Sequence, residues 1–267
     1  MIVGVNLEGV TSDAAALTAA AMLADDLRRR MYAFIRRADG PVSRDDAAAA
    51  VGISRKLAAF HLDKLVEAGL LRATYVRPAG LPRPGRSPKA YLPANVDVQV
   101  SIPQREHATL AGILIDAINS TAPAEDARNA ALRVATERGR DLGTAERDRI
   151  RPGRLGAERA LTFATGTLER YGFEPARAEP TRVWLRNCPF QPLAAHAPEL
   201  VCRINRAFLA GFLDGLGASA LTAVLLPRPD GCCVELRTTG SQAPAPATFG
   251  VRGDGGRAGT GGPDGPR

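Results

Sequence analysis

The sequence predicts an α+β protein with two folded parts. In the first part, two short helical patterns flank a tight turn, and two strand-like runs follow, all between residues 43 and 93. In the second part, three helical segments precede two strand pairs that flank one long helix, ending near residue 237. Runs of helices and separate hairpins, without regular strand–helix alternation, favour helices packed on a small antiparallel sheet.

The two helices of the first part have clear start and stop signals. Ser43 is a good N-cap with Asp46 three positions on, and Gly52 suits the left-handed position that ends a helix. Ser54 caps the second helix and Gly69 ends it. The apolar positions of this second helix follow helical spacing at Ala58, Leu62, Leu65 and Val66. Two helices joined by such a short turn form a helix-turn-helix.

A wing is predicted after the second helix. Leu70–Arg77 and Lys89–Pro93 have strand-like composition, and the loop between them is rich in Pro and Gly and carries Arg83 and Arg86. The N-terminal residues of a recognition helix read base edges, while basic residues elsewhere contact phosphates. The residues predicted to contact DNA are Ser43, Arg44, Ser54, Arg55, Lys56, Ala59, Phe60, Lys64, Arg83, Arg86 and Lys89. A small helical domain with a solvated basic loop is the alternative.

Two stretches in this region carry a family resemblance. The runs AFHLDKLVEAGLL and GRSPKAYLP resemble the winged helix-turn-helix of bacterial regulators of the ArsR and DeoR kind, over roughly Leu23–Pro93. The resemblance implies that the partner is a double-stranded DNA operator. The amphipathic segment Leu23–Arg37 would then be the first helix of this domain, packed beneath the other two.

The charge distribution agrees with a DNA-binding surface in this region. The chain of 267 residues has a net charge of +7, and residues 22–95 hold 14 Lys or Arg against 7 Asp or Glu. An excess of this kind suits phosphate contact. No apolar run approaches the ~20 residues that span a bilayer, and the N-terminus lacks the basic region of a signal peptide. We therefore expect a cytoplasmic protein with no membrane partner.

Four regions are expected along the chain: a weakly structured N-terminus (1–21), the winged helix-turn-helix (22–95), a dimerisation and sensor domain (96–239) and a disordered Gly/Pro-rich tail (240–267). The third begins with a strand-like alternation at Asn95–Ile102. Its expected helices are Gln104–Asn119, Pro123–Leu142, Leu155–Tyr171 and Ala197–Leu216, and its expected strands are 173–178, 182–187, 221–226 and 232–237. The first of these helices is a candidate dimer helix in a homodimer, or simply part of the core.

All four cysteines lie in the sensor domain, at Cys188, Cys202, Cys232 and Cys233. Each occupies the end of an element or a position near one, so the four thiols can converge at one edge of the sheet. In a cytosolic protein such a set suggests a metal or a cluster before disulfides. Buried core thiols are the alternative, because free cysteine is among the most buried residue types. If Cys232 and Cys233 lie in a strand, they face opposite sides, so one is core and the other a ligand.

The run NCPFQPLAAHAPELVC, followed by a helix, a glycine turn and CC, is similar to the sensor domain of the SufR family. Those regulators are winged-helix repressors that hold an iron–sulfur cluster. The resemblance implies Cys188, Cys202 and either Cys232 or Cys233 as ligands of a 4Fe–4S or 2Fe–2S cluster, with zinc or no cofactor as alternatives. The family's pattern has one more cysteine near the position of Leu216, where this chain has no thiol.

Three functions compete at this point. The first is a DNA-binding transcriptional regulator that senses redox state, an iron–sulfur cluster or a metal through its cysteines. The second is the same regulator with a small apolar ligand and structural cysteines. The third is an enzyme with Cys188 or Cys202 as nucleophile and His196 as base, but the chain lacks a nucleophile elbow, a phosphate loop or a paired-carboxylate motif. We expect a regulator and no enzymatic activity.

Overall fold

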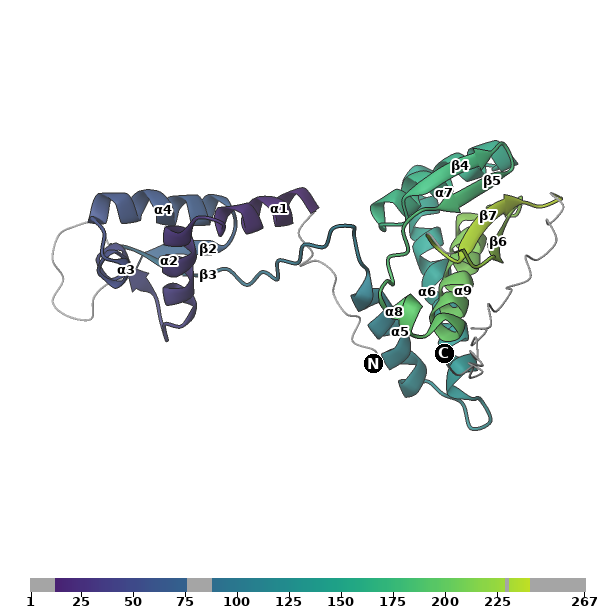
Figure 1. Cartoon of the computed structure of the whole chain (residues 1–267), viewed down its shortest axis with the longest axis horizontal. Coiled ribbons are helices and arrows are strands. Elements are labelled where there is room, and N and C mark those ends of the chain that lie inside the picture. Colours follow the sequence, from purple (N-terminus) through teal and green to yellow (C-terminus); the bar gives the residue numbers. More distant parts are fainter. Residues whose placement is uncertain (1–12, 76–87, 229–230, 241–267) are drawn as a thin grey trace, which may run out of the picture. The chain divides into compact units, whose positions relative to one another are not determined.

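The computed structural model describes residues 13–75, 88–228 and 231–240. The chain divides into two compact units, Met1–Gln104 and Arg105–Arg267, each shown as a ribbon in Figure 1. Both units combine helices with a small antiparallel sheet, so the predicted α+β class is confirmed. The predicted residues Arg83 and Arg86 lie outside the described residues.

The first unit contains four described helices and a three-stranded sheet. The helices are α1 (Asp13–Met22), α2 (Asp26–Arg36), α3 (Arg44–Val51) and α4 (Arg55–Glu67), and the strands are β1 (Val42–Ser43), β2 (Leu71–Tyr75) and β3 (Lys89–Pro93). The strand order is β1-β3-β2, and both pairings are antiparallel. Met31, Ile35, Leu62, Leu65 and Tyr91 are fully buried between the helices and this sheet. Their packing fixes α3, the turn and α4 on one small core.

Two expectations for this unit need correction. The N-terminus, residues 1–21, is expected to be weakly structured, but residues 13–22 form α1, because the alanine-rich run DAAALTAAAM has high intrinsic helix propensity. The strand expected at Asn95–Ile102 does not form, apart from an isolated bridge at Asp97. Its alternating residues are largely exposed, and Val98 packs against the core without a full partner strand. A period-2 pattern therefore did not suffice to make a strand here.

The second unit combines five described helices with a four-stranded sheet. The helices are α5 (His107–Asn119), α6 (Ala127–Ile150), α7 (Ala157–Arg170), α8 (Leu193–His196) and α9 (Pro198–Leu216). The strands are β4 (Pro175–Glu179), β5 (Arg182–Leu185), β6 (Leu221–Leu225) and β7 (Val234–Thr238), in the antiparallel order β4-β5-β7-β6. Cys232 and Cys233 precede β7, although they were expected to open it. The short helix α8 was not predicted.

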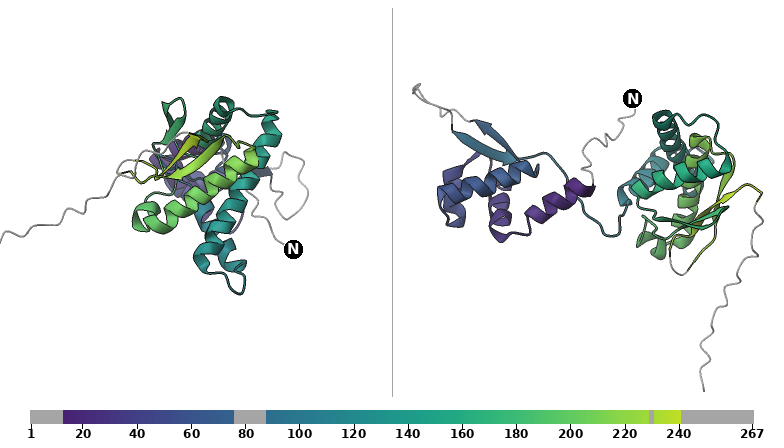
Figure 2. Two further views of the ribbon diagram at one scale, coloured as in Figure 1. Left: turned by 90° about the vertical axis from the view of Figure 1, so that its right-hand side faces the viewer. Right: turned by 90° about the horizontal axis from the view of Figure 1, so that it is seen from above.

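The long helices α6 and α9 lie directly against each other, as two further views show (Figure 2). Gly139 and Gly143 of α6 meet Gly211 and Gly215 of α9. A Cβ atom on Gly139 would lie 2.0 Å from the carbonyl oxygen of Phe208, and one on Gly211 would lie 2.0 Å from that of Thr136. Only glycine permits such an approach of two backbones. This contact fixes the position of α9, the helix that carries Cys202.

Candidate functional site

The turn between α3 and α4 has the capping predicted from the sequence. The Ser43 hydroxyl accepts a hydrogen bond of 3.2 Å from the backbone N–H of Asp46. Gly52 ends α3 with a φ of 73°, and Ser54 then accepts from the N–H of Leu57 at 3.3 Å. These caps satisfy helix-end amides and set the start of α4 at the surface. The predicted caps are therefore confirmed.

The first turn of α4 and the residues that follow it form an exposed surface. Ser54, Arg55 and Lys56 are exposed there, as a recognition helix requires. Two large apolar side chains join them, because Leu57 is 42% and Phe60 is 55% exposed. Leu57 was not among the predicted DNA contacts. Its place next to three exposed polar residues at a helix start was the signal that could have found it. Apolar side chains at such a place suit the methyl groups of thymine.

Arg55 forms an ion pair with Asp45 of α3, with Nε 3.2 Å from Oδ1. The two side chains are 68% and 62% exposed. An exposed pair of this kind contributes about 0–1 kcal/mol, so Arg55 can exchange Asp45 for a DNA phosphate or base at little cost.

The remaining predicted contacts lie at the edges of this surface. Lys64 pairs with Glu67 at 2.7 Å, and Lys89 pairs with Asp63 at 2.5 Å, while Tyr91 also donates to that carboxylate. The hydrogen bond to Asp63 raises the pKa of Lys89. Lys89 thus ties β3 to α4. Ser43, Arg44 and Ala59 are half-buried.

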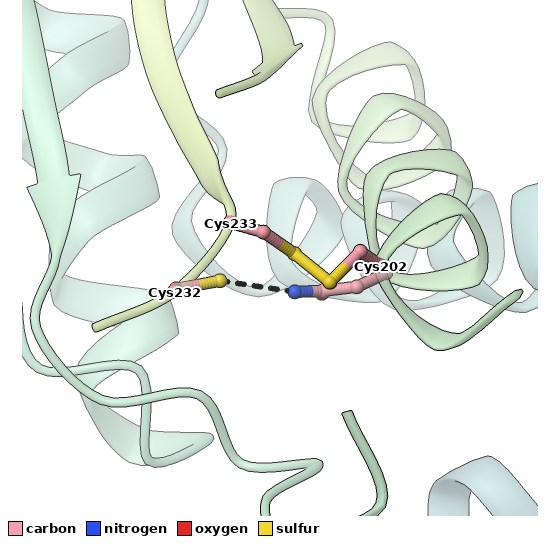
Figure 3. Close-up of a disulfide and its surroundings, with 4 residues drawn as sticks. Cys202, Cys232 and Cys233 are labelled. Carbon is pink, nitrogen blue, oxygen red and sulfur yellow. Dashed lines mark hydrogen bonds between the residues drawn. A yellow bond between two sulfur atoms is a disulfide. The ribbon is translucent and has the colours of Figure 1, made fainter. Parts of the chain in front are cut away.

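The second site is a group of four cysteines in the second unit. Cys188 follows β5, Cys202 lies in α9, and Cys232 and Cys233 lie just before β7. Cys202 and Cys233 form a disulfide, whose Cα atoms are 6.1 Å apart (Figure 3). Cys188 and Cys232 are free and buried, and their sulfur atoms share a hydrogen bond. The structure therefore brings together all four predicted cysteines, as two pairs.

Cys188 lies among hydrogen-bond donors. The S–H of Cys232 donates to its sulfur and lowers the pKa of the Cys188 thiol to about 7, against an ordinary 9.0. The backbone N–H groups of Phe190 and Gln191 and the charge of Arg105 act in the same direction, while burial opposes them. The same hydrogen bond and burial raise the pKa of Cys232. Of the two thiols, Cys188 is therefore the one that ionises first as the pH rises.

Asn205 completes the site, and sequence reasoning missed it. Its side chain is completely buried on α9, one turn after Cys202. Its Nδ2 donates a hydrogen bond of 3.1 Å to the sulfur of Cys232, drawn as the dashed line in Figure 3. Its Oδ1 has no hydrogen-bond partner among the described residues. A polar residue on the buried face of an apolar helix beside a cysteine was the available signal.

The expected division of Cys232 and Cys233 by strand parity is wrong. Both side chains are buried, at 2% and 8% exposure, and the strand that follows is buried on both faces as well, from Val234 to Arg237. Their bonding separates them instead, since Cys233 is bonded to Cys202 and Cys232 contacts Cys188 and Asn205. His196, the candidate nitrogen ligand or base, is exposed at the end of α8.

The four sulfurs could bind a metal ion or a cluster only after the Cys202–Cys233 disulfide has been reduced. Within the described residues, no group of three or more His, Cys, Asp or Glu side chains is arranged to hold a metal ion. Two of the four sulfurs are bonded to each other in this form. Reduction of that disulfide would provide four thiols, three buried and Cys202 partly exposed, and thiolates are ligands that an iron–sulfur cluster or zinc accepts.

Comparison with known proteins supports the first site. A family model described as a helix-turn-helix domain matches residues 23–73, which contain α2, α3, α4 and most of β2. The chain carries a helix-turn-helix DNA-binding domain. This match points to a transcription regulator rather than an enzyme. A search of curated proteins found no match. Among the described helices, none is long and apolar enough to cross a membrane.

Proposed function

We propose that this transcription regulator binds a duplex operator sequence-specifically as a homodimer and senses redox state through its four cysteines. The observation that carries the sensor role is the gathering of Cys188, Cys202, Cys232 and Cys233, from three separate segments, in one group of the second unit. Cysteines that only pack in a core would not need to form a hydrogen-bonded pair of thiols next to a disulfide.

The reduced site is the form in which a cofactor would be held. With the Cys202–Cys233 bond open, these sulfurs and those of Cys188 and Cys232 would be the ligands of an iron–sulfur cluster, with zinc as the alternative. Oxidants destroy such a cluster or change its charge, so the cluster would supply the redox-sensitive group. Asn205 would donate its N–H to the Cys232 sulfur in that form too. A hydrogen bond to a ligating sulfur tunes the properties of such a centre.

Helix α5 supports the homodimer. Its Leu110, Ile113 and Ala117 are buried in the core of the unit, while the opposite face exposes Ile115 at 57% and Ile118 at 73%. The exposed apolar stripe of α5 consists of Ala108, Ala111, Ile115 and Ile118. Its spacing alternates between three and four residues, as in the a and d positions of paired helices. A second copy would cover this stripe and supply a second recognition helix for the other half-site.

The test uses the full chain purified without oxygen. Duplexes selected by the protein from a random-sequence pool provide the operator, and fluorescence polarisation gives its affinity. We expect the affinity to change when the protein is oxidised and to recover after reduction. An absorbance scan and an iron and zinc assay on the same sample report any bound cofactor.

A variant with all four cysteines replaced by serine is the control. It should bind the operator with one affinity under oxidising and reducing conditions. If this variant responds to oxidant as the wild type does, the cysteines are structural and the sensor proposal is wrong. A small apolar ligand would then be the effector to search for. If no duplex sequence is enriched from the random pool, sequence-specific binding is excluded.

A further inference from the structure

The two free thiols already lie in contact. Cys188 and Cys232 are 3% and 2% exposed, and their side chains form a hydrogen bond with each other. The backbone N–H of Cys232 also donates to the carbonyl of Leu185 at 2.9 Å, which places Cys232 beside the segment that leads to Cys188. The remaining sulfurs, of Cys202 and Cys233, are engaged with each other. Each cysteine therefore has one assigned partner, although Cys232 and Cys233 are adjacent in the sequence.

The surroundings hold both sulfurs of the free pair in place. The backbone of Cys188 is fixed, because its carbonyl oxygen accepts from the N–H of Gln191 and from Nη1 of Arg105, both at 3.1 Å. The Cys232 sulfur accepts from Nδ2 of Asn205, whose side chain is fully buried. A completely buried amide with an unpartnered Oδ1 is costly in a core. Its donation to sulfur gives it a positioning role at this pair.

We propose that Cys188 and Cys232 form a second redox pair, which closes into a disulfide when a peroxide oxidises the protein. The inference rests on the proposed function, because it specifies the chemistry of the cysteine sensor. The pair would convert a chemical signal into a covalent link between the loop after β5 and the segment before β7. The Cys202–Cys233 bond already joins that segment to α9.

The reaction takes place in two steps. The Cys188 thiolate attacks one peroxide oxygen, so that an S–O bond forms, the O–O bond breaks and hydroxide leaves with the electron pair. This hydroxide takes the proton of the Cys232 thiol and becomes water. The Cys232 thiolate then attacks the Cys188 sulfur, so that an S–S bond forms, the S–O bond breaks and a second hydroxide leaves. The two sulfurs together lose two electrons, and the peroxide gains them.

Burial selects the oxidant. Cys202 is partly exposed, whereas Cys188 and Cys232 are almost closed to solvent. A water-sized reagent such as hydrogen peroxide fits this restriction, and a bulky alkylating reagent does not. In the folded protein we therefore expect peroxide to consume both free thiols under conditions in which a large maleimide labels neither.

Matched double variants of the full chain test the assigned partners. The variant C202S/C233S keeps Cys188 with Cys232, while C188S/C233S and C202S/C232S keep mismatched pairs. Each is reduced, freed of metal by a chelator, exposed to hydrogen peroxide and unfolded in N-ethylmaleimide. Intact-mass analysis then counts labelled thiols and detects the loss of two hydrogen atoms that marks a disulfide. Circular dichroism confirms that each variant is folded.

We expect C202S/C233S to lose both thiols and the two mismatched variants to keep theirs. Equal closure of a mismatched pair, or unreacted thiols in C202S/C233S, would overturn the inference. Wild-type protein with its disulfide intact provides a second measurement, in which peroxide should remove both remaining thiols. If Cys188 and Cys232 form a disulfide while operator affinity stays constant, the assigned pairing is correct and the proposed sensor function is wrong. If the thiols stay free while oxidation still changes operator affinity, the function holds and this chemistry is wrong.

Discussion

Arg105 donates a hydrogen bond of 3.1 Å from Nη1 to the backbone carbonyl oxygen of Cys188. The next residue continues the contact, because the N–H of Glu106 donates to the carbonyl of Pro189 at 2.9 Å. His107 Nε2 then lies 2.7 Å from the carbonyl oxygen of Gln191. Three consecutive residues at the start of α5 thus hold the loop that carries Cys188. Movement of that loop reaches α5, the helix with the exposed apolar stripe.

The first prediction concerns this contact. Arg105→Gln removes the guanidinium and should reduce the difference in operator affinity between reduced and oxidised protein. The variant should still bind the operator when reduced, because Arg105 lies outside the helix-turn-helix domain. Fluorescence polarisation under both conditions measures the difference. Arg128→Gln, at an exposed position of α6, is the control and should respond as the wild type does. If Arg105→Gln shows the same difference in operator affinity as the wild type, the contact between Arg105 and the Cys188 loop does not carry the signal.

The second prediction is a pH dependence. Because the Cys188 pKa is lowered to about 7, the thiol is largely protonated and unreactive below pH 7 and largely thiolate above it. The rate at which peroxide removes the free thiols should therefore rise through pH 7 and level off before pH 9. Samples in which the reaction is stopped at successive times and the free thiols are counted give the rate at each pH. Cys232→Ala removes the main donor to Cys188, so the pH midpoint for oxidation of Cys188 by peroxide should rise toward the ordinary value of 9.0. A wild-type midpoint near 9 would contradict the assignment.

The predictability of the two sites from the sequence differs for a physical reason. The helix-turn-helix rests on local signals: Ser43, Gly52 and Ser54 act through hydrogen bonds and φ angles within a few residues. The convergence of the cysteines followed from their places at element ends. Their pairing did not, because Cys232 and Cys233 are adjacent and both buried, so burial does not separate their roles. The role of Asn205 depends on a contact across the core, 27 residues away in sequence.

The close contact of α6 and α9 was also beyond sequence reasoning, and it gives the third prediction. Gly139→Ala would place a Cβ against the carbonyl oxygen of Phe208, so the two helices must separate. We expect a loss of about 1–3 kcal/mol or more in the free energy of unfolding. Gly166→Ala is the matched control in α7, since nothing lies within 4 Å of its Cβ position. It should gain up to about 1 kcal/mol. Urea denaturation of both variants provides the comparison, and equal effects would mean that the helices do not touch.

The fourth prediction tests the exposed stripe of α5. Ile118→Glu adds a charge to a side chain that is 73% exposed in the single chain, so the fold should persist. The dimer should dissociate, because two carboxylates would be buried against each other between the copies. Light scattering after size exclusion measures the mass. Asn119→Glu, next in the helix and also exposed but outside the stripe, should leave the mass unchanged. Equal masses for the two variants would place the dimer contact elsewhere.

The last prediction concerns the reading of DNA. Arg55 and Lys56 are exposed at the start of α4, and Arg55 forms a solvent-exposed ion pair with Asp45. If these side chains donate to base edges, Arg55→Ala and Lys56→Ala should each weaken operator binding by about 1–3 kcal/mol. Binding to random duplex DNA should fall less, because it depends on phosphate contacts.

Two comparisons make that test specific. Lys64→Ala removes a charge farther along α4 that is paired with Glu67, so it should weaken operator and random DNA by similar amounts. Replacing Arg83 and Arg86 together should flatten the salt dependence of binding, since each phosphate contact contributes a slope of about −0.9. Titrations of both duplexes over a range of salt concentrations separate these effects. Equal losses on operator and random DNA for Arg55→Ala and Lys56→Ala would show that the start of α4 contacts only the phosphate backbone, and base reading would then fall to Leu57 and Phe60.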